Sequence, residues 1–382
     1  MSGKDTFRIM IPSTQKHVFI VGCERSGSTW IANILDSHPD VEFFMEPFAD
    51  YVEIFRGLPE RNIYIPSGNV QLRAIVENGV RGLAAMKYSL LYNRNRPVVL
   101  KFLDRVLLWQ YRFLCRSLRM RPALRASRHG LLNLNTAAIP VRRHFRKNRN
   151  SSTWVIKDLR LPFKIGLLSQ VFPNAKYVIS IRDPGAQIMS ILNLFKRGSL
   201  VELKKALPSF IKCIQDNDRF RKYRELCTHF DWENDVETML AIWWLINYNT
   251  LLEDLSGFGL EHMMVRHEVI SENPNETVQD VLRFCGLDMD TQVESYVCQS
   301  STSNQCVASP VDTYRYSAEY SKNTILSVPT ALRRKIGCIF SYGDGSLLNE
   351  TIMRWYDYLK WMSPAARTTG GADGGEKQGI EE

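Results

Sequence analysis

Short apolar runs alternate along the chain with segments in which apolar residues recur at helical spacing. The runs are rich in Val and Ile and occupy 17–22, 97–102, 153–158, 176–181 and 262–267. Continuous runs of this length suit strands that are buried on both faces of a parallel sheet. The helical segments are 28–37, 161–171, 185–196, 236–255 and 274–285. This alternation predicts an α/β fold, a doubly wound parallel sheet flanked by helices.

The pattern predicts one domain over 1–363. A segment at about 103–150 interrupts the alternation and is expected to be a helical insertion between two strands. Gly-Gly pairs and scattered charges after 363 indicate a disordered tail, 364–382. A length of 382 residues is ordinary for one α/β domain with insertions.

Composition narrows the class of protein and its location. No run of eighteen apolar residues is present, so no membrane-spanning helix is expected. The first residues lack the apolar core of a signal peptide. The eight cysteines are scattered without a Cys-x-x-Cys pair, which favours reduced thiols over disulfides or a zinc site. We therefore expect a cytoplasmic protein without a metal centre.

The segment after the first apolar run has the features of a phosphate-binding loop. Gly22 and Gly27 have the spacing of a Walker A loop, and the loop opens the predicted helix 28–37. Backbone N–H groups of such a loop converge on phosphate oxygens, and the helix N-terminus adds its positive dipole end. Ser28 stands where Walker A has its lysine, and the cation of the loop is Arg25 instead. This predicts a P-loop-type fold that is poorly suited to ordinary ATP or GTP hydrolysis.

A second candidate phosphate site follows the run 176–181. Arg182 would lie at the carboxyl end of a strand, where open α/β sheets bind ligands. Asp183 can cap a helix that begins at Pro184, and Ser190 lies two turns into that helix. An arginine can hold a phosphate through two parallel hydrogen bonds. A purely structural Arg-Asp pair at a helix start is the alternative.

The sequence Arg-Ser-Gly-Ser-Thr-Trp of the loop resembles the 5′-phosphosulfate loop of sulfotransferases that use 3′-phosphoadenosine-5′-phosphosulfate (PAPS). Its arginine form is closer to the carbohydrate and tyrosyl-protein branches than to the cytosolic small-molecule branch, as are the segments 36–41 and 43–48. The resemblance covers roughly 17–60 and 153–310. It implies that the loop residues contact the donor; these are Arg25, Ser26, Gly27, Ser28, Thr29 and Trp30.

The resemblance also implies roles for other residues. Arg182 and Ser190 would hold the 3′-phosphate, and the donor would leave as 3′-phosphoadenosine 5′-phosphate (PAP) without a metal. The late segment 265–287 resembles the family as well, although His267 replaces its usual Tyr and Val269 its usual Asp. Ser300 to Gln305 resembles a donor-contacting loop of the tyrosyl branch, with a polar linker as the alternative.

Three side chains are candidates for catalysis. Glu46 follows the strand after the loop helix, at the family's spacing for a general base, and its apolar neighbours are expected to raise its pKa. Glu42 is the competing carboxylate. The resemblance implies that Lys157, near the end of the run 153–158, contacts the transferring group, and a solvated lysine at the end of a strand is the alternative. Arg25 would stabilise the sulfuryl and phosphate oxygens. Sulfuryl transfer is expected to run in line, with catalysis by positioning and electrostatics.

Positive charge gathers in the insertion. The chain carries a formal charge of +9, and 94–149 alone holds fifteen Lys or Arg and one acidic residue. Within it, 103–119 has the pattern of a basic amphipathic helix. Three interpretations are open, namely an anionic membrane surface, an acidic glycan, or a solvated face that packs on the domain. No nucleic-acid motif accompanies the charge.

The sequence favours a PAPS-dependent sulfotransferase whose acceptor is a hydroxyl of a glycan or glycolipid. A tyrosyl peptide or a small metabolite is the next acceptor class. Two other functions are open: another P-loop enzyme, such as a kinase or NTPase, and a non-catalytic nucleotide- or membrane-binding protein of this fold. The pair Trp243-Trp244 lies in a helical apolar pattern and is expected in the core.

Overall fold

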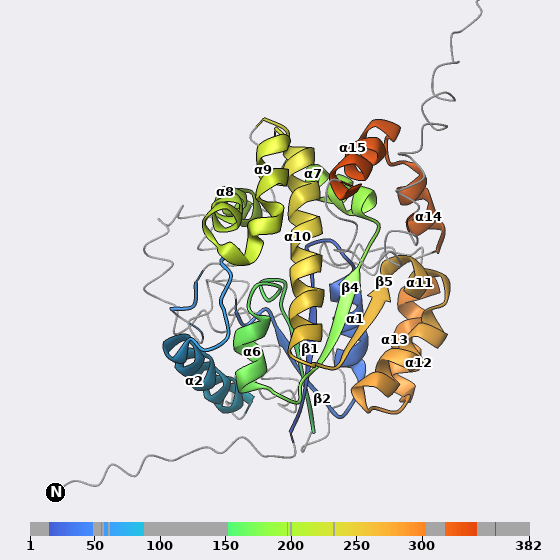
Figure 1. Cartoon of the computed structure of the whole chain (residues 1–382). Helices are drawn as coiled ribbons and strands as arrows, with labels where there is room; N and C mark the ends of the chain where they lie inside the picture. Colours follow the sequence, from blue (N-terminus) through green and yellow to red (C-terminus); the bar gives the residue numbers. More distant parts are fainter. Residues whose placement is uncertain are drawn as a thin grey trace, which may run out of the picture. The chain divides into compact units, whose positions relative to one another are not determined.

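A computed structural model shows how the predicted strands and helices are arranged (Figure 1). It describes residues 15–48, 55, 57–59, 62–87, 152–196, 198, 201–231, 234–302, 318–341 and 356. The predicted strand 97–102, the insertion 103–150 and the tail 364–382 lie outside the described residues. The single-domain boundary and the basic helix at 103–119 therefore stay predictions.

Within the described residues, five parallel strands form one sheet in the order β2-β3-β1-β4-β5. They are β1 (Lys16–Gly22), β2 (Val41–Met45), β3 (Thr153–Lys157), β4 (Lys176–Ile181) and β5 (His262–Arg266). The α/β class and the parallel sheet with flanking helices are confirmed. Because all neighbouring strands run in the same direction, their carboxyl ends meet at one edge of the sheet.

The chain forms two compact units. The first comprises Met1–Ile181 and Leu251–Tyr320, and the second comprises Arg182–Thr250 and Ser321–Glu382. The first unit holds the whole sheet together with α1 (Ser28–Ser37), α2 (Val70–Lys87), α6 (Ile165–Val171), α11 (His267–Glu272), α12 (Pro274–Cys285) and α13 (Thr291–Thr302).

The second unit is helical within the described residues. It contains α7 (Pro184–Lys196), α8 (Val201–Asp216), η3 (Asp218–Tyr223), α9 (Arg224–His229) and α15 (Thr330–Ser341). One boundary between the units follows β4, and the other two fall within α10 (Val236–Gly257) and α14 (Ala318–Leu326). Trp243 and Trp244 of α10 are buried, which confirms the expected core position. The Trp244 Nε1 donates a hydrogen bond to Gln187 of α7 at 3.0 Å.

Alternate residues of the strands build a core on each face of the sheet. Val18 and Ile20 of β1 pack in one apolar cluster with Trp30 of α1 and with residues of α12 and α13. On the other face, Phe19 stacks on Tyr177 of β4, with their ring centroids 5.3 Å apart. This double burial explains why the strands read as continuous apolar runs.

Local sequence signals explain several helix ends. Pro184 and Pro274 begin α7 and α12, where a proline loses no helical hydrogen bond. Gly286 ends α12 with a φ of 70°, a conformation that favours glycine. Helix α6 begins at Ile165, later than the predicted 161, because turns that include Pro162 precede it. None of the described helices is long and apolar enough to cross a membrane.

Candidate functional site

The loop between β1 and α1 packs so closely against its neighbours that two positions require glycine. Gly22 has a φ of 148°, and a Cβ there would lie 2.4 Å from the carbonyl oxygen of Ser180 in β4. Gly27 has a φ of 96°, and a Cβ there would lie 2.7 Å from Nδ1 of His267 in α11. The Ser180 hydroxyl also donates a hydrogen bond to the Ser26 carbonyl at 2.9 Å. Strand β4 and helix α11 therefore fix the shape of the loop.

The loop presents the features that bind an anion. Helix α1 begins after Gly27, which has no side chain to accept a hydrogen bond from the first backbone N–H groups of the helix; the Gly27 carbonyl accepts from the Trp30 N–H at 2.9 Å. Arg25 and Thr29 are half-buried, while Ser28 is buried. The Ser26 hydroxyl is buried and has no hydrogen-bond partner in the described part of the chain. A phosphate group would complete these contacts.

Trp30 has a different position from the rest of the loop motif. Its side chain has no exposed surface and belongs to the apolar core. Its Nε1 donates a hydrogen bond to the Ser300 hydroxyl of α13 at 2.9 Å. The indole thus joins the loop helix to α13, and a donor contact through this side chain is disfavoured by its burial. Residues 303–305 of the predicted late donor loop lie outside the described residues.

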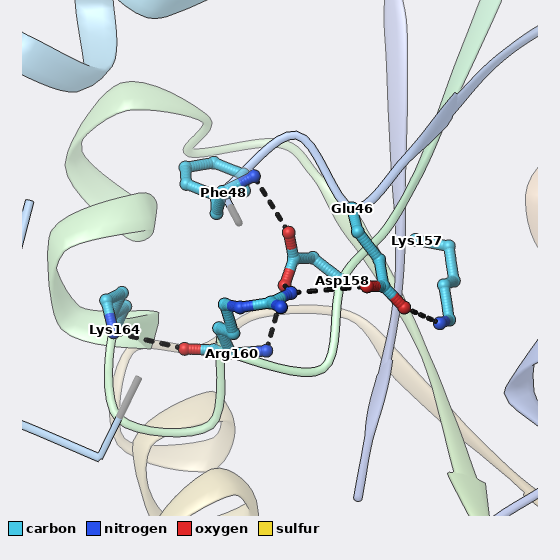
Figure 2. Close-up of polar contacts among 6 residues, drawn as sticks. All are labelled: Glu46, Phe48, Lys157, Asp158, Arg160 and Lys164. Carbon is cyan, nitrogen blue, oxygen red and sulfur yellow. Dashed lines mark hydrogen bonds and ion pairs between the residues drawn. The ribbon is translucent and has the colours of Figure 1, made fainter. Parts of the chain in front are cut away.

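Glu46 lies at the carboxyl edge of the sheet, one residue beyond β2, and its carboxylate meets two cations (Figure 2). Lys157 Nζ binds one carboxylate oxygen, and Arg160 Nη1 lies 3.3 Å from the other. The Glu46 backbone N–H donates to the Lys157 carbonyl at 2.7 Å. The Lys157 side chain is 3% exposed and that of Glu46 is 24% exposed, so solvent reaches the carboxylate and barely reaches the lysine.

Two candidate catalytic residues share an unusual backbone conformation. Arg25 has a φ of 70° and Glu46 a φ of 48°, and no other described residue except glycine has a positive φ. Non-glycine residues in this region cost free energy and persist only where the surroundings hold them in place. Such strain gathers at functional sites, which is an observation independent of any sequence motif.

The expected raised pKa of Glu46 is wrong. Burial does favour the neutral acid, but the charges of Lys157 and Arg160 and their hydrogen bonds outweigh it, and the pKa falls to about 2. The apolar neighbours of Glu46 in the sequence suggested the opposite. The two cations lie more than a hundred residues further along the chain, so the pairing becomes visible only in the fold.

Asp158, which the sequence did not single out, is fully buried beneath this ion pair. One of its carboxylate oxygens accepts a hydrogen bond from the Phe48 N–H at 2.8 Å. The other accepts from the Arg160 N–H at 2.9 Å, and Arg160 Nη1 lies 3.5 Å from it. Burial raises the pKa of Asp158, and the Arg160 charge opposes that rise. In the sequence, the position of Asp158 directly after the candidate Lys157 was the signal that could have marked it as a site residue.

The remaining candidates are placed as follows. Arg182 directly follows β4 and is buried, and Ser190 is half-buried on α7 in the second unit. The Asp183 carboxylate accepts from the Ala186 N–H at 2.7 Å, which confirms the predicted helix cap. Glu42 is buried within β2 and does not lie at its end. Among the described residues, no cluster of His, Cys, Asp or Glu could hold a metal ion.

Solved structures similar to this chain are themselves sulfotransferases. The sulfotransferase domain of an olefin synthase from Synechococcus PCC 7002 is 13% identical, with a TM-score of 0.38 over 87% of this chain and 98% of that one. A sulfotransferase from Alicyclobacillus acidocaldarius is 14% identical, with a TM-score of 0.32 over 75% and 91%. Sulfotransferase STF9 from Mycobacterium avium is 14% identical, with a TM-score of 0.35 over 87% and 77%.

No curated protein matches the chain. The family model described as the sulfotransferase family matches residues 17–291, which span the phosphate loop, the Glu46 ion pair, Arg182 and the sheet. The chain belongs to the sulfotransferase family.

Proposed function

We propose that this protein transfers a sulfuryl group from PAPS to an acceptor hydroxyl. One observation carries the proposal beyond family membership. Glu46, held in a left-handed backbone conformation, is paired with Lys157 at the sheet edge where the phosphate loop begins. Because β3 lies between β1 and β2, Lys157 ends between the strand that leads to the loop and the strand that leads to Glu46.

The residues of the loop fit the phosphosulfate end of the donor. Ser180 and His267 lie close to its two glycines, and helix α1 has no side-chain cap. The Ser26 hydroxyl has no hydrogen-bond partner among the described residues. We assign the 5′-phosphosulfate to this loop, with Arg25 neutralising the charge that spreads over its oxygens. Arg182 and Ser190 are assigned to the 3′-phosphate, since an arginine suits a phosphate dianion.

The proposed mechanism must account for the ion pair of Glu46. A carboxylate with a pKa of about 2 is ionised but is a weak base. In this proposal, Lys157 turns from Glu46 towards the anionic oxygens of the PAPS donor. When Glu46 loses its contact with Lys157, its pKa rises, because the charge of Lys157 no longer opposes the effect of burial. Glu46 would then accept the proton of the acceptor hydroxyl, while Lys157 stabilises the departing charge.

We propose a glycan or glycolipid hydroxyl as the acceptor. The support is the likeness of the arginine-containing loop and of 36–48 to the carbohydrate branch, a likeness shared with the tyrosyl branch. A cytoplasmic location stays a prediction. Contact of 103–119 with an anionic membrane surface also stays a prediction, because that segment lies outside the described residues.

The acceptor class can be found directly by labelling. We expect radiolabelled sulfate from PAPS to enter the glycan or glycolipid fraction when the protein is incubated with separated lipids, glycans and proteins. The label would be followed by chromatography, with the Arg182→Ala variant as a control for contaminating activity. Label in the protein fraction alone would replace the proposed acceptor with a tyrosyl one, and no label in any fraction would contradict sulfuryl transfer.

Changing Glu46→Gln should lower turnover by roughly 10²–10⁴-fold, the usual contribution of a general base. Affinity for PAP should stay at the wild-type value, because the amide removes the base without removing a phosphate contact. Initial rates and calorimetric titration with PAP measure the two effects. Glu42→Gln is the matched control and should keep its turnover. A Glu46→Gln enzyme as fast as wild type would exclude Glu46 as the base.

Changing Lys157→Met should raise the pKa of Glu46 by at least about one unit, because burial is then opposed by Arg160 alone. Carbon NMR titration of the Glu46 carboxyl in the ligand-free protein measures the change. Lys176→Met is the control, since Lys176 pairs with Glu261 instead. If the pKa stayed at about 2, Arg160 and not Lys157 would control Glu46.

Changing Arg182→Ala should weaken the binding of PAP by at least about tenfold, because a charge-assisted contact to a phosphate is lost. Calorimetric titration measures it. Arg283→Ala serves as the control, since Arg283 is exposed on α12 and pairs with Asp280 of the same helix. Equal PAP affinity in the two variants would remove Arg182 from the 3′-phosphate site.

A further inference from the structure

Asp158 is a buried carboxylate for which the proposed mechanism has no role. It has no exposed surface, yet it stands directly beside the residue that ends β3 at the site. Keeping an ionised carboxylate away from water is costly unless hydrogen bonds and a cation compensate it. Asp158 has both, from the Phe48 N–H, the Arg160 N–H and the Arg160 guanidinium. Its partners therefore indicate what the residue does.

The first partner belongs to the segment that carries Glu46. The Glu46 N–H donates to the Lys157 carbonyl, and two residues later the Phe48 N–H donates to the Asp158 carboxylate. Between them, Pro47 has a fixed φ and no N–H to donate. The two neighbouring residues Lys157 and Asp158 thus hold the backbone on both sides of Glu46 (Figure 2). A backbone with a φ of 48° needs such restraint to persist.

The second partner is the cation that shares Glu46 with Lys157. Asp158 accepts the Arg160 N–H at 2.9 Å, and Lys164 Nζ donates to the Arg160 carbonyl at 3.2 Å. These two bonds fix the backbone of Arg160 on either side of its Cα. Its guanidinium then reaches Glu46 at 3.3 Å and Asp158 at 3.5 Å. One buried carboxylate therefore sets the position of the candidate base and of one of its cations.

We propose that Asp158 is a positioning residue that holds Glu46 and Arg160 in the geometry needed for sulfuryl transfer. The proposal rests on the proposed function of Glu46 as base. It differs from a stabilising role alone, because it requires Asp158 to act on turnover through Glu46. A structural carboxylate would lower the stability when replaced, but would leave turnover per folded molecule unchanged.

The test uses Asp158→Asn, which keeps the shape of the side chain. An amide has one acceptor oxygen, so one of the two N–H groups would face an NH₂ donor and lose its bond. We expect kcat for transfer of radiolabelled sulfate from PAPS to the mixed glycan and lipid extract to fall by on the order of 10²-fold. A small displacement of a reacting group causes a rate loss of this size. PAP affinity should stay within about twofold of wild type, since the variant keeps every residue assigned to the phosphates.

Asp235→Asn is the matched control for stability. Asp235 also accepts two backbone N–H bonds, from Glu237 and Thr238, and pairs with one cation, Lys335. These three partners belong neither to the loop between β1 and α1 nor to the ion pair of Glu46. We expect both variants to lower the unfolding midpoint, and only Asp158→Asn to lower kcat. Equal kcat in the two variants would overturn the positioning role.

A double variant identifies the route of the effect. If Asp158 acts through Glu46, adding Asp158→Asn to Glu46→Gln should change kcat by less than about threefold, because residues that act as a unit are not additive. A full additional loss of about 10²-fold would show that Asp158 acts independently and would overturn the proposal.

A measurement without turnover separates this inference from the proposed function. Hydrogen exchange of the Phe48 amide or of the Arg160 amide should be faster in Asp158→Asn than in wild type and in Asp235→Asn, because the single amide oxygen can accept from only one of them. Unchanged exchange of both amides would overturn the positioning role whatever the enzyme transfers. Absence of transfer by the wild type, by contrast, would contradict the proposed function itself.

Discussion

The pairing of β2 with β3 is the constraint on which the site depends. Met45 stands opposite Lys157 in this parallel pair, so the residue after each strand reaches the same edge of the sheet. Glu46 and Asp158 thereby meet although they lie far apart in the chain. A shift of one residue in this register would turn every side chain of β2 to the other face. The ion pair, the buried carboxylate and the bent backbone all follow from this single alignment.

Charge balance at the site explains why a partly buried glutamate is ionised. Two cations and one further carboxylate surround it, and their hydrogen bonds replace those of water. This charge balance would change if an anionic ligand bound at the site, since Lys157 and Arg160 would interact with the ligand as well as with Glu46. In the proposed mechanism, an anionic donor would compete with Glu46 for Lys157, and the basicity of the carboxylate would then depend on that donor.

Periodic segments were predictable from the sequence, whereas contacts between distant segments were not. The helices 28–37 and 274–285 and the strand 176–181 have the predicted bounds, because apolar spacing, proline and glycine all act locally. Helices α2, α8, α13, α14 and α15 were not predicted. Helix α8 contains Pro208 in its interior, and a proline at such a position normally predicts the end of a helix. The strand order could not be derived either, since β1 pairs with β3 and β4, and no local pattern indicates which later strands it will pair with.

The candidate site shows the same division. The glycines of the loop, the cap at Asp183 and the positions of Glu46 and Lys157 at strand ends followed from local patterns. The pKa of Glu46 was predicted in the wrong direction because its cations are distant in sequence. The core position of Trp30 and its bond to Ser300 were missed for the same reason, since they join residues 270 positions apart. Motif resemblance supplied the candidate residues, and the fold shows what the described ones contact.

The central place of β1 in an all-parallel sheet has a kinetic consequence. Its neighbours are β3 and β4, and Lys16 stands opposite Thr153. A parallel strand cannot pair without a long crossover, and pairing between such distant segments is slow. During synthesis, β1 therefore emerges from the ribosome long before either partner. The phosphate loop would acquire its shape late, and nascent chains that end before β3 would lack it although they contain every loop residue.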